Sequence, residues 1–124
     1  MTEYLASFAT GDPDAVVACV TDDFVNEHLS ELGSGCRGAH EYRQRLSGFL
    51  STFVGARYTV VTLAEILTPG AGDVVVRYRF RATCEGSPID IPGVMWFAVR
   101  DGLIARRTDL WDSLTFLRQT GGDE

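Results

Sequence analysis

Residues 73–84 read DVVVRYRFRATC, and this stretch decides the fold. In it the large apolar side chains Val76, Tyr78 and Phe80 alternate with three arginines. Because successive side chains of a β-strand point to opposite faces, the pattern predicts a strand with one buried face and one wet face. We interpret the arginines as the solvated face of this strand rather than as a binding stripe.

Strand-like segments flank this stretch on both sides. They occupy residues 58–67, 89–99 and 103–111, and turns are expected at residues 69–72, 85–86 and 100–102. Tight turns between consecutive strands make them antiparallel neighbours, so the second half of the chain predicts a four-stranded meander. Pro92-Gly93 interrupts one of these segments and predicts a bulge or a bend there.

Helical patterns dominate the first half of the chain. Helices are expected at residues 3–10, 13–20 and 39–53, and a short one follows the strands at 113–119. Asp12 and Asp112 are expected to cap two of them. Residues 24–28 are typical of a short strand, and residues 29–38 of a polar loop. This order predicts one α+β domain, residues 1–124, with three N-terminal helices on one face of a curved sheet.

Length and charge narrow the functional classes. The chain has 124 residues, 45% of them apolar and 23% charged, as in an ordinary globular domain with its own core. Its net charge of −6 disfavours nucleic acid as a partner, because phosphate recognition needs a basic face. No apolar run reaches the roughly 20 residues that span a bilayer, and no signal peptide precedes the first helix. We therefore expect a cytoplasmic protein with no membrane partner.

The cysteines and histidines form no recognisable ligand set. The cysteines Cys19, Cys36 and Cys84 lie far apart, which suits a reducing compartment and predicts no disulfide framework. We expect Cys19 and Cys84 in the core and Cys36 exposed in a loop. The two histidines are not at metal-ligand spacing, so the sequence predicts neither a metal site nor a cofactor.

Residues 33–38, GSGCRG, have the G-x-G-x-x-G spacing of a dinucleotide-binding turn. A Rossmann unit needs such glycines directly after a strand, with a parallel second strand behind them. Here the expected strand ends five residues earlier, at His28, and the later strands meander. We therefore interpret GSGCRG as a loop that enters the third helix at a pocket rim. Arg37 in this loop is either solvated or in contact with an acidic ligand.

Asp109 is the main candidate for chemistry. Helices packed over a strongly curved sheet leave an apolar cavity, and polar side chains on the strands then define a site. Asp109 lies in the sequence RRTDLWDS, on the last expected strand, and by period two it shares a face with Arg107 and Trp111. A carboxylate in a dry, aromatic-walled pocket can exchange protons near neutral pH. The alternative is an exposed or turn-capping aspartate.

His28 is the second candidate. It shares a strand face with Asn26, and imidazole is the side chain best suited to exchange protons near pH 7. The alternative is a partly exposed loop histidine. Four aromatic side chains can donate hydrogen bonds to a substrate, or wall its pocket, or simply fill the core: Tyr4, Tyr78, Trp96 and Trp111.

The two ends of the chain resemble a known superfamily. Residues 4–12, YLASFATGD, and 14–25, DAVVACVTDDFV, resemble the opening of the nuclear-transport-factor-two-like superfamily. Residues 99–117, VRDGLIARRTDLWDSLTFL, look like its last strands and terminal helix. The superfamily includes ketosteroid isomerases, limonene-epoxide hydrolases and SnoaL-like polyketide cyclases. The resemblance implies a cone-shaped α+β fold with one deep apolar pocket, and a homodimer formed through the sheet.

The resemblance also implies roles for individual residues. Asp109 matches the essential aspartate of the epoxide hydrolases and the acid/base aspartate of the cyclases. His28 falls where the isomerases place a catalytic aspartate, and Asn26 where the epoxide hydrolases have a water-binding tyrosine. Tyr4 matches the oxyanion-hole tyrosine of the isomerases, and Trp111 an aromatic pocket wall.

Two departures from the family patterns bear on activity. The epoxide hydrolases carry an Arg-x-Asp motif on the strand that corresponds to residues 73–84, and this chain has no aspartate there in either register. Their Asp-Arg-Asp triad is therefore absent. Met95 stands where the isomerases have a protonated aspartate. One carboxylate and one histidine remain, which is nearest to the cyclase arrangement.

We therefore expect a cofactor-independent SnoaL-like cyclase or isomerase that moves protons on a hydrophobic, oxygenated, polyketide-like substrate. Asp109 and His28 form its acid/base pair, or His28 polarises a substrate oxygen. Six side chains are expected to bind the substrate or to exclude water from it: Tyr4, Asn26, Tyr78, Trp96, Trp111 and Phe116. Two alternatives stay open: an epoxide hydrolase or epoxide-opening cyclase, and a non-catalytic small-molecule-binding module.

Overall fold

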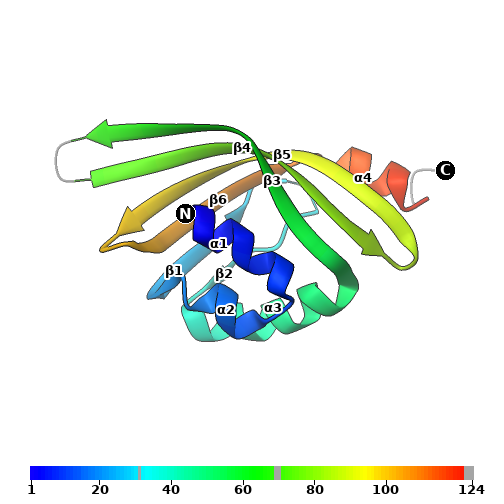
Figure 1. The fold of residues 1–124 in the computed structure, drawn as a ribbon, viewed down its shortest axis with the longest axis horizontal. Helices are drawn as coiled ribbons and strands as arrows, with labels where there is room; N and C mark the ends of the chain where they lie inside the picture. Colours follow the sequence, from blue (N-terminus) through cyan, green and yellow to red (C-terminus); the bar gives the residue numbers. More distant parts are fainter. Residues whose placement is uncertain (31, 69–70, 122–124) are drawn as a thin grey trace.

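The computed structural model describes residues 1–30, 32–68 and 71–121. Within these residues, one curved sheet carries the N-terminal helices on one side (Figure 1). Its strands are β1 (Val20–His28), β2 (Cys36–Arg37), β3 (Phe53–Thr68), β4 (Ala71–Cys84), β5 (Ser87–Arg100) and β6 (Leu103–Trp111). The helices are α1 (Thr2–Ser7), the 3₁₀ helix η1 (Phe8–Thr10), α2 (Pro13–Val17), α3 (Ala39–Thr52) and α4 (Ser113–Gln119). The α+β class and the curved sheet with helices packed on it are confirmed.

The second half of the chain forms the predicted antiparallel meander. In the described part of the chain the strand order is β2-β1-β6-β5-β4-β3, and each of β3, β4 and β5 pairs antiparallel with the next strand. β1 departs from the expected antiparallel sheet, because it runs parallel to β6. After β1 the chain crosses through α3 to the far edge of the sheet, so the meander brings β6 back beside β1 in the same direction. This pairing sets His28 opposite Asp109.

The alternation in β4 produces two different faces. Val76 and Tyr78 are buried, whereas Arg77 between them is exposed. The predicted solvated arginine face is therefore confirmed. Of the two possibilities predicted at Pro92-Gly93, a bulge or a bend, the bulge is wrong, because β5 pairs with β4 without interruption through these residues. A Cβ atom added at Gly93 would lie only 2.3 Å from the Tyr78 hydroxyl, so this glycine makes room for a side chain on the neighbouring strand.

The turns of the meander use glycine where the backbone needs it. Gly86 and Gly102 have φ of 82° and 78°, and they close the β4–β5 and β5–β6 turns as expected. A left-handed backbone costs glycine little, whereas it strains residues that carry a Cβ. The turn expected at residues 69–72 lies partly outside the described residues.

The second helix is shorter than its apolar pattern predicts. α2 ends at Val17, and Val20, which was expected on its apolar stripe, begins β1 and pairs with Ile104. Valine is β-branched and favours a strand when a partner strand is available, so pairing with β6 overrides the helical pattern. Both predicted caps are confirmed: Asp12 accepts a hydrogen bond from Asp14 N, and Asp112 accepts one from Thr115 N.

The core lies between the helices and the inner face of the sheet. Tyr4, Phe8 and Phe97 are almost fully buried there, and the ring of Tyr4 meets both of the others edge to face. Such contacts add to the apolar area that these rings bury. Cys36 is buried in β2, so the prediction that it is exposed is wrong.

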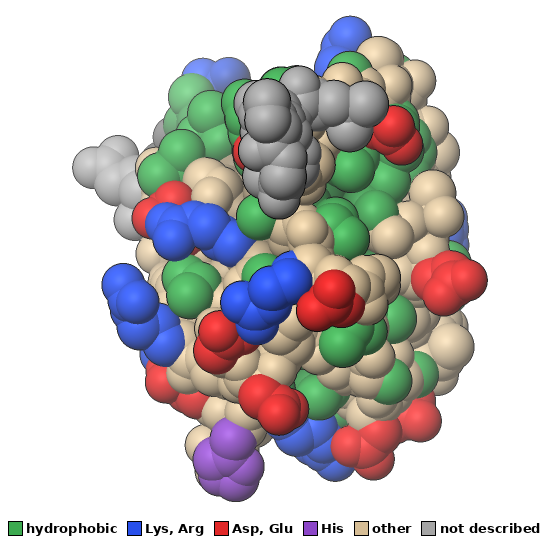
Figure 2. Space-filling view, turned by 90° about the vertical axis from the view of Figure 1, so that its left-hand side faces the viewer, with side chains coloured by type: hydrophobic (Ala, Val, Ile, Leu, Met, Phe, Trp, Pro, Cys, Tyr) green, Lys and Arg blue, Asp and Glu red, His purple; other side chains and the backbone are tan. Residues whose placement is uncertain are grey.

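The surface gives two further observations. No helix in residues 1–30, 32–68 or 71–121 is long and apolar enough to cross a membrane. Figure 2 shows the side of the molecule on the left of Figure 1, where acidic and basic side chains are interspersed rather than gathered by sign. The described residues that are visible on that side form no continuous basic surface.

Candidate active site

A cavity of about 300 Å³ opens on the inner face of the sheet. This volume is at the lower end of the range for small-molecule sites. Its walls are mostly apolar and come from α3, from the strands β1, β3, β4, β5 and β6, from residues 32–34 and from α4. The apolar side chains that line it include Phe49, Phe53, Phe80, Ile89, Ile91 and Phe116. Polar groups enter it from the side of β1 and β6, so the cavity has an apolar body and one polar end.

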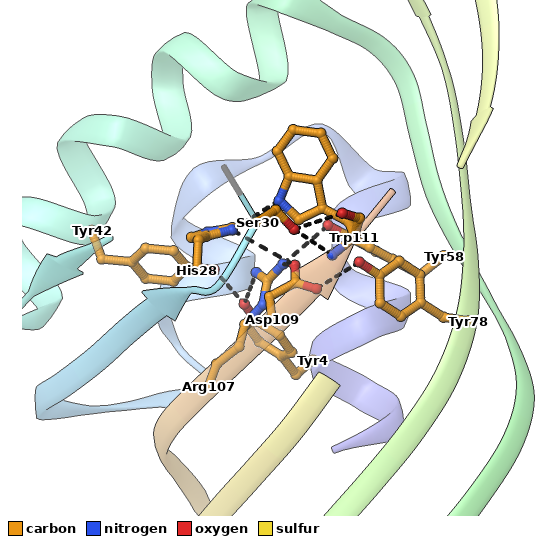
Figure 3. A network of polar contacts seen from close by, with 9 residues as sticks. All are labelled: Tyr4, His28, Ser30, Tyr42, Tyr58, Tyr78, Arg107, Asp109 and Trp111. Carbon is orange, nitrogen blue, oxygen red and sulfur yellow. Dashed lines mark hydrogen bonds and ion pairs between the residues drawn. The ribbon is translucent and has the colours of Figure 1, made fainter. Parts of the chain in front are cut away.

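Asp109 is the carboxylate of that polar end. It lies on β6 and is 2% exposed. Its Oδ1 accepts a hydrogen bond of 2.6 Å from the Tyr78 hydroxyl, and its Oδ2 accepts one of 2.7 Å from Nη2 of Arg107 (Figure 3). A buried carboxylate needs such donors, because it has given up its hydration. Both partners hold the carboxylate in one orientation toward the cavity.

Arg107 links the carboxylate to a group of tyrosines. It is 4% exposed, and its guanidinium carbon lies 5.8–5.9 Å from the ring centres of Tyr4, Phe8 and Tyr58. Nη1 donates to Tyr4 at 2.8 Å, and Nη2 reaches Tyr58 at 3.3 Å. Aromatic faces and hydroxyls thus replace water around a buried cation. The sequence pattern placed Arg107 on the same strand face as Asp109, but Arg107 was not named as a site residue. Its position two residues before the candidate carboxylate is the sequence signal that points to it.

The two tyrosines that line the cavity have different hydrogen-bonding roles. Tyr78 gives its proton to Asp109, whereas the Tyr58 oxygen accepts from Arg107 and keeps its own proton. Burial raises the pKa of both phenols above 10, so both are neutral near pH 7. The Tyr58 hydroxyl proton therefore has no acceptor among the described residues and is available in the cavity. Tyr58 was not among the predicted site residues, although it is the first residue of the strand predicted at residues 58–67.

His28 faces Asp109 from the neighbouring strand. Its Nδ1 lies 4.0 Å from Oδ2 of Asp109 and accepts a 3.2 Å hydrogen bond from the Trp111 indole. Burial, and then the charge of Arg107, lower the pKa of His28 to about 4, although Asp109 acts in the opposite sense. The ring is therefore neutral at pH 7, and because Nδ1 accepts, its proton is on Nε2.

A serine fixes the tryptophan that bonds to His28. Ser30 Oγ donates to the backbone oxygen of Trp111 and accepts from its backbone nitrogen, both at 2.6 Å (Figure 3). This side chain continues the pairing of β1 with β6 beyond the end of β1. Trp111 and Phe116 lie edge to face at 5.9 Å and both line the cavity, where the sequence placed them.

The glycine-rich loop packs closely against β1. A Cβ atom at Gly33 would lie 2.3 Å from Cβ of His28, and one at Gly35 would lie 2.5 Å from the backbone oxygen of Asn26. Gly33 and Ser34 line the cavity, as expected of a loop at its rim. Gly38 precedes α3, but the next strand, β3, lies at the far edge of the sheet and not beside β1, so the topology contradicts a dinucleotide-binding unit. Close packing on β1 explains two of the three glycines.

Three predicted residues do not reach the main cavity. The Tyr4 hydroxyl is occupied behind the site by Arg107 and by Tyr42, to which it is hydrogen bonded. Trp96 points to the outer face of the sheet, is 44% exposed and donates to Asp73 at 2.8 Å. The prediction that Trp96 walls the pocket is therefore wrong, because β5 presents it on the face opposite to Met95. Asn26 is buried and lines a smaller neighbouring cavity.

The described residues contain no group of three or more His, Cys, Asp or Glu side chains that could hold a metal ion. The arrangement has instead one fixed carboxylate, one neutral imidazole and one phenol with a free proton around the end of an apolar cavity. Such a set can accept a proton from a ligand and donate hydrogen bonds to its oxygen.

Comparison with known proteins places this geometry in a family context. A sequence profile of the SnoaL-like domain matches residues 1–107. No curated protein sequence matches the chain. A Catenulispora acidiphila protein with a ketosteroid isomerase-like fold superposes with a TM-score of 0.83 at 15% identity, covering 97% of this chain and 90% of that one.

Two other solved structures carry names that concern activity. An LEH-like epoxide hydrolase of M. tuberculosis has a TM-score of 0.77 at 22% identity, covering 98% of this chain and 86% of its own. A candidate polyketide cyclase of Xanthomonas campestris has a TM-score of 0.69 at 20% identity, covering 95% and 91%. At these identities the similarity shows a shared fold.

Proposed function

Because the chain belongs to the SnoaL-like domain family, we propose that it is a cofactor-independent cyclase or isomerase that moves a proton on a hydrophobic, oxygenated substrate. The observation that carries the proposal is the buried carboxylate of Asp109, which stands alone among the described residues at the polar end of an apolar cavity. The similarity to a candidate polyketide cyclase supports a polyketide-like substrate.

Asp109 is the proposed base. Each of its oxygens accepts one hydrogen bond, from Tyr78 or from Arg107, and each keeps a lone pair for a substrate proton. The substrate proton is on a carbon next to a carbonyl group. Its removal leaves negative charge on the carbonyl oxygen, and the protonated Asp109 returns the proton at another atom of the substrate.

Two donors are proposed to stabilise the oxygen that becomes negative. The Tyr58 hydroxyl keeps its proton while it accepts from Arg107, and the neutral His28 ring carries a proton on Nε2. Fixed donors in a dry site stabilise developing charge without reorganisation. This assigns His28 to polarising the substrate oxygen, the second of its two predicted roles, because the low pKa of His28 makes it a poor proton acceptor at pH 7.

Arg107 keeps the total charge of the site balanced. Its Nη2 lies 2.7 Å from Oδ2 of Asp109 and 3.3 Å from the Tyr58 oxygen. When the proton moves to Asp109, the negative charge moves to the substrate oxygen beside Tyr58. The Arg107 guanidinium faces both the Asp109 carboxylate and the substrate oxygen, so the negative charge stays next to its counter-ion throughout the proton transfer.

Solvent exchange on a model ketone tests this proposal. With 1-tetralone in D₂O, we expect the protein to catalyse loss of the proton NMR signal of the carbon next to the carbonyl. Asp109→Asn should reduce the catalysed rate by about 100-fold or more, because amide nitrogen and oxygen cannot accept this proton. Asp73→Asn is the matched control, since Asp73 lies on the outer face and bonds to Trp96.

The alternatives give different results in the same set of assays. If 1-tetralone binds equally well to wild type and Asp109→Asn and no exchange occurs in either, the chain is a binding module and the enzymatic proposal is wrong. If styrene oxide is opened in an Asp109-dependent reaction and tetralone is not exchanged, the epoxide-opening alternative replaces it. Among the described residues that line the cavity, Asp109 is the only carboxylate, which favours proton transfer over a two-aspartate hydrolysis.

We also propose that two copies of the chain associate through the outer face of the sheet. Val94, Trp96 and Leu110 on β5 and β6 are 40%, 44% and 52% exposed there. Contiguous exposed apolar side chains on a sheet commonly mark an interface. The neighbouring arginines of β4 would then form part of a polar rim.

A further inference from the structure

A second, smaller cavity adjoins the main one. It has a volume of about 110 Å³, and His28, Ser34, Phe49 and Arg107 line both cavities. Asn26 lines only the smaller cavity, which we call the side cavity. The proposed function makes no use of the side cavity, although it lies directly behind His28 and Arg107, two groups of the proposed site.

Two buried polar atoms at this place have no hydrogen-bond partner among the described residues. They are Oδ1 of Asn26, which can only accept, and Nε of Arg107, which can only donate. Asn26 is 9% exposed and Arg107 is 4% exposed. The two residues occupy directly paired positions of β1 and β6, so their side chains leave the same face of the sheet next to one another.

These paired residues thus present one unpartnered acceptor and one unpartnered donor, a combination that suits a group that is both donor and acceptor. A hydroxyl oxygen meets this requirement, because its proton can reach Asn26 while its lone pair receives the Arg107 N–H. A carbonyl oxygen would satisfy Arg107 and leave Asn26 without a donor, and an ether would do the same. Buried polar atoms without partners are costly, so a hydroxyl has a strong preference for this place over an apolar group of its size. The volume of the side cavity also suits a group of a few atoms.

We infer that the side cavity binds one hydroxyl oxygen, which an alcohol or phenol on the ligand supplies, or water when the ligand has no such group. The inference rests on the proposed function, because it takes the ligand to be the proposed substrate. The apolar body of this ligand fills the main cavity, and its hydroxyl enters the side cavity. It assigns the substrate class more narrowly: an apolar ketone with a hydroxyl group several bonds away from the reacting carbon. His28 and Arg107 stand between the two ends of such a ligand.

A matched pair of probes tests the inference. We would measure the affinities of 6-hydroxy-1-tetralone and 6-methyl-1-tetralone, which differ by a hydroxyl in place of a methyl group. Wild type should bind the hydroxy probe about tenfold more tightly, and Asn26→Leu should remove this preference. Thr21→Val is the control, since it removes a buried hydroxyl from the same strand, where Thr21 bonds to Asp23, and should keep the preference.

A crystal structure of the ligand-free protein distinguishes the two sources of the oxygen. An ordered water within hydrogen-bonding distance of both Asn26 Oδ1 and Arg107 Nε, with no preference between the probes, overturns the ligand hydroxyl and identifies a structural water as the occupant. A preference that Asn26→Leu removes identifies the ligand. The inference is overturned if no oxygen lies between these atoms and the probe preference is the same in wild type and Asn26→Leu.

The proposed function can fail separately from this inference. Catalysed exchange of deuterium into the probes depends on Asp109, whereas the affinity ratio depends on Asn26. Loss of exchange with the ratio intact would refute the reaction and leave the side cavity as a hydroxyl site of a binding protein. The opposite result would leave the reaction and refute the hydroxyl site.

Discussion

At the scale of single residues, Tyr78 can bond to Asp109 only because Gly93 has no side chain. A Cβ atom at Gly93 would lie 2.3 Å from the hydroxyl and 2.4 Å from Cζ of Tyr78. We predict that Gly93→Ala lowers the free energy of unfolding by about 1–3 kcal/mol, because the ring must leave its position and the Asp109 carboxylate loses a donor. Chemical denaturation measures this change.

Gly48→Ala is the matched control for this prediction. Gly48 lies within α3, and a Cβ atom there would have nothing within 4 Å. Alanine is the better helix former, so this variant should be more stable by about 0.5–1 kcal/mol. If Gly93→Ala and Gly48→Ala were both as stable as the wild type, the close approach of Gly93 to Tyr78 would not contribute to stability.

His28 gives the stability of the protein a pH dependence. The pKa of this ring is about 4 in the folded protein and 6.5 ordinarily, so between these values the unfolded chain binds more protons. The contribution of His28 is therefore complete above pH 6.5 and is lost as the pH falls toward 4. A shift of this size corresponds to roughly 3 kcal/mol.

Denaturation at a series of pH values, together with NMR titration of the imidazole, measures the effect. We expect His28→Gln to flatten the fall in stability between pH 6.5 and 4. His40→Gln is the control, because His40 is exposed at the start of α3 and should leave the slope as it is. If the NMR signal of His28 titrated with a pKa of 6.5 or above, burial and the charge of Arg107 would not be the main influences on the pKa of this ring.

At the scale of elements, we expect the glycine-rich loop of residues 32–35 to fix the position of β1. Its glycines touch the backbone of Asn26 and the side chain of His28, so the loop can lie flat on the strand that carries both. We predict that Gly35→Ala lifts the loop from β1, costs about 1–3 kcal/mol of stability and shifts the imidazole NMR signals of His28.

Ser34→Ala tests the same loop without adding an atom. Ser34 accepts a hydrogen bond from Arg45 at the surface, so its loss should cost less than about 1 kcal/mol. If Gly35→Ala left the NMR signals of His28 unchanged, the loop would not position the strand.

The elements also show what sequence patterns can and cannot predict. The meander, its turns at Gly86 and Gly102 and both aspartate caps follow from local patterns, because each depends on residues close in sequence. The end of α2 does not, because Val20 leaves the helix to pair with Ile104, far away in the chain. Long-range pairing of this kind cannot be read from a window of neighbouring residues.

The same distinction applies to the candidate site. Asp109 was predicted because it is a carboxylate among apolar strand residues, and the structure buries it at the cavity. Tyr58 and Tyr42 were missed, since their link to the site runs through Arg107 and Tyr4 rather than through the sequence. Trp96 was misplaced because period two along β5 fixes which residues share a face but not which face is inside.

At the scale of the whole molecule, the proposed association of two copies through the outer face of the sheet can be tested. Val94 and Leu110 lie directly opposite one another on β5 and β6 and are both exposed. If two copies pack through this face, Leu110→Glu should place a charge in a desolvated interface and convert a dimer to a monomer. Sedimentation analysis over a range of concentrations measures the change in mass.

Leu114→Glu is the control for the interface, since Leu114 is similarly exposed, at 47%, but lies on α4. It should leave the mass unchanged. A wild-type protein that sediments as a monomer at every concentration would refute association through the sheet.

The opposite placement of the two tryptophans gives the protein two internal optical reporters. Trp111 lines the cavity beside His28, and Trp96 stands on the outer face. A ligand that enters the cavity should change the emission of Trp111, whereas association through the sheet should shield Trp96 from a quencher such as acrylamide. With Trp96→Phe and Trp111→Phe, occupancy and assembly become separately visible by fluorescence, and no dye has to be attached.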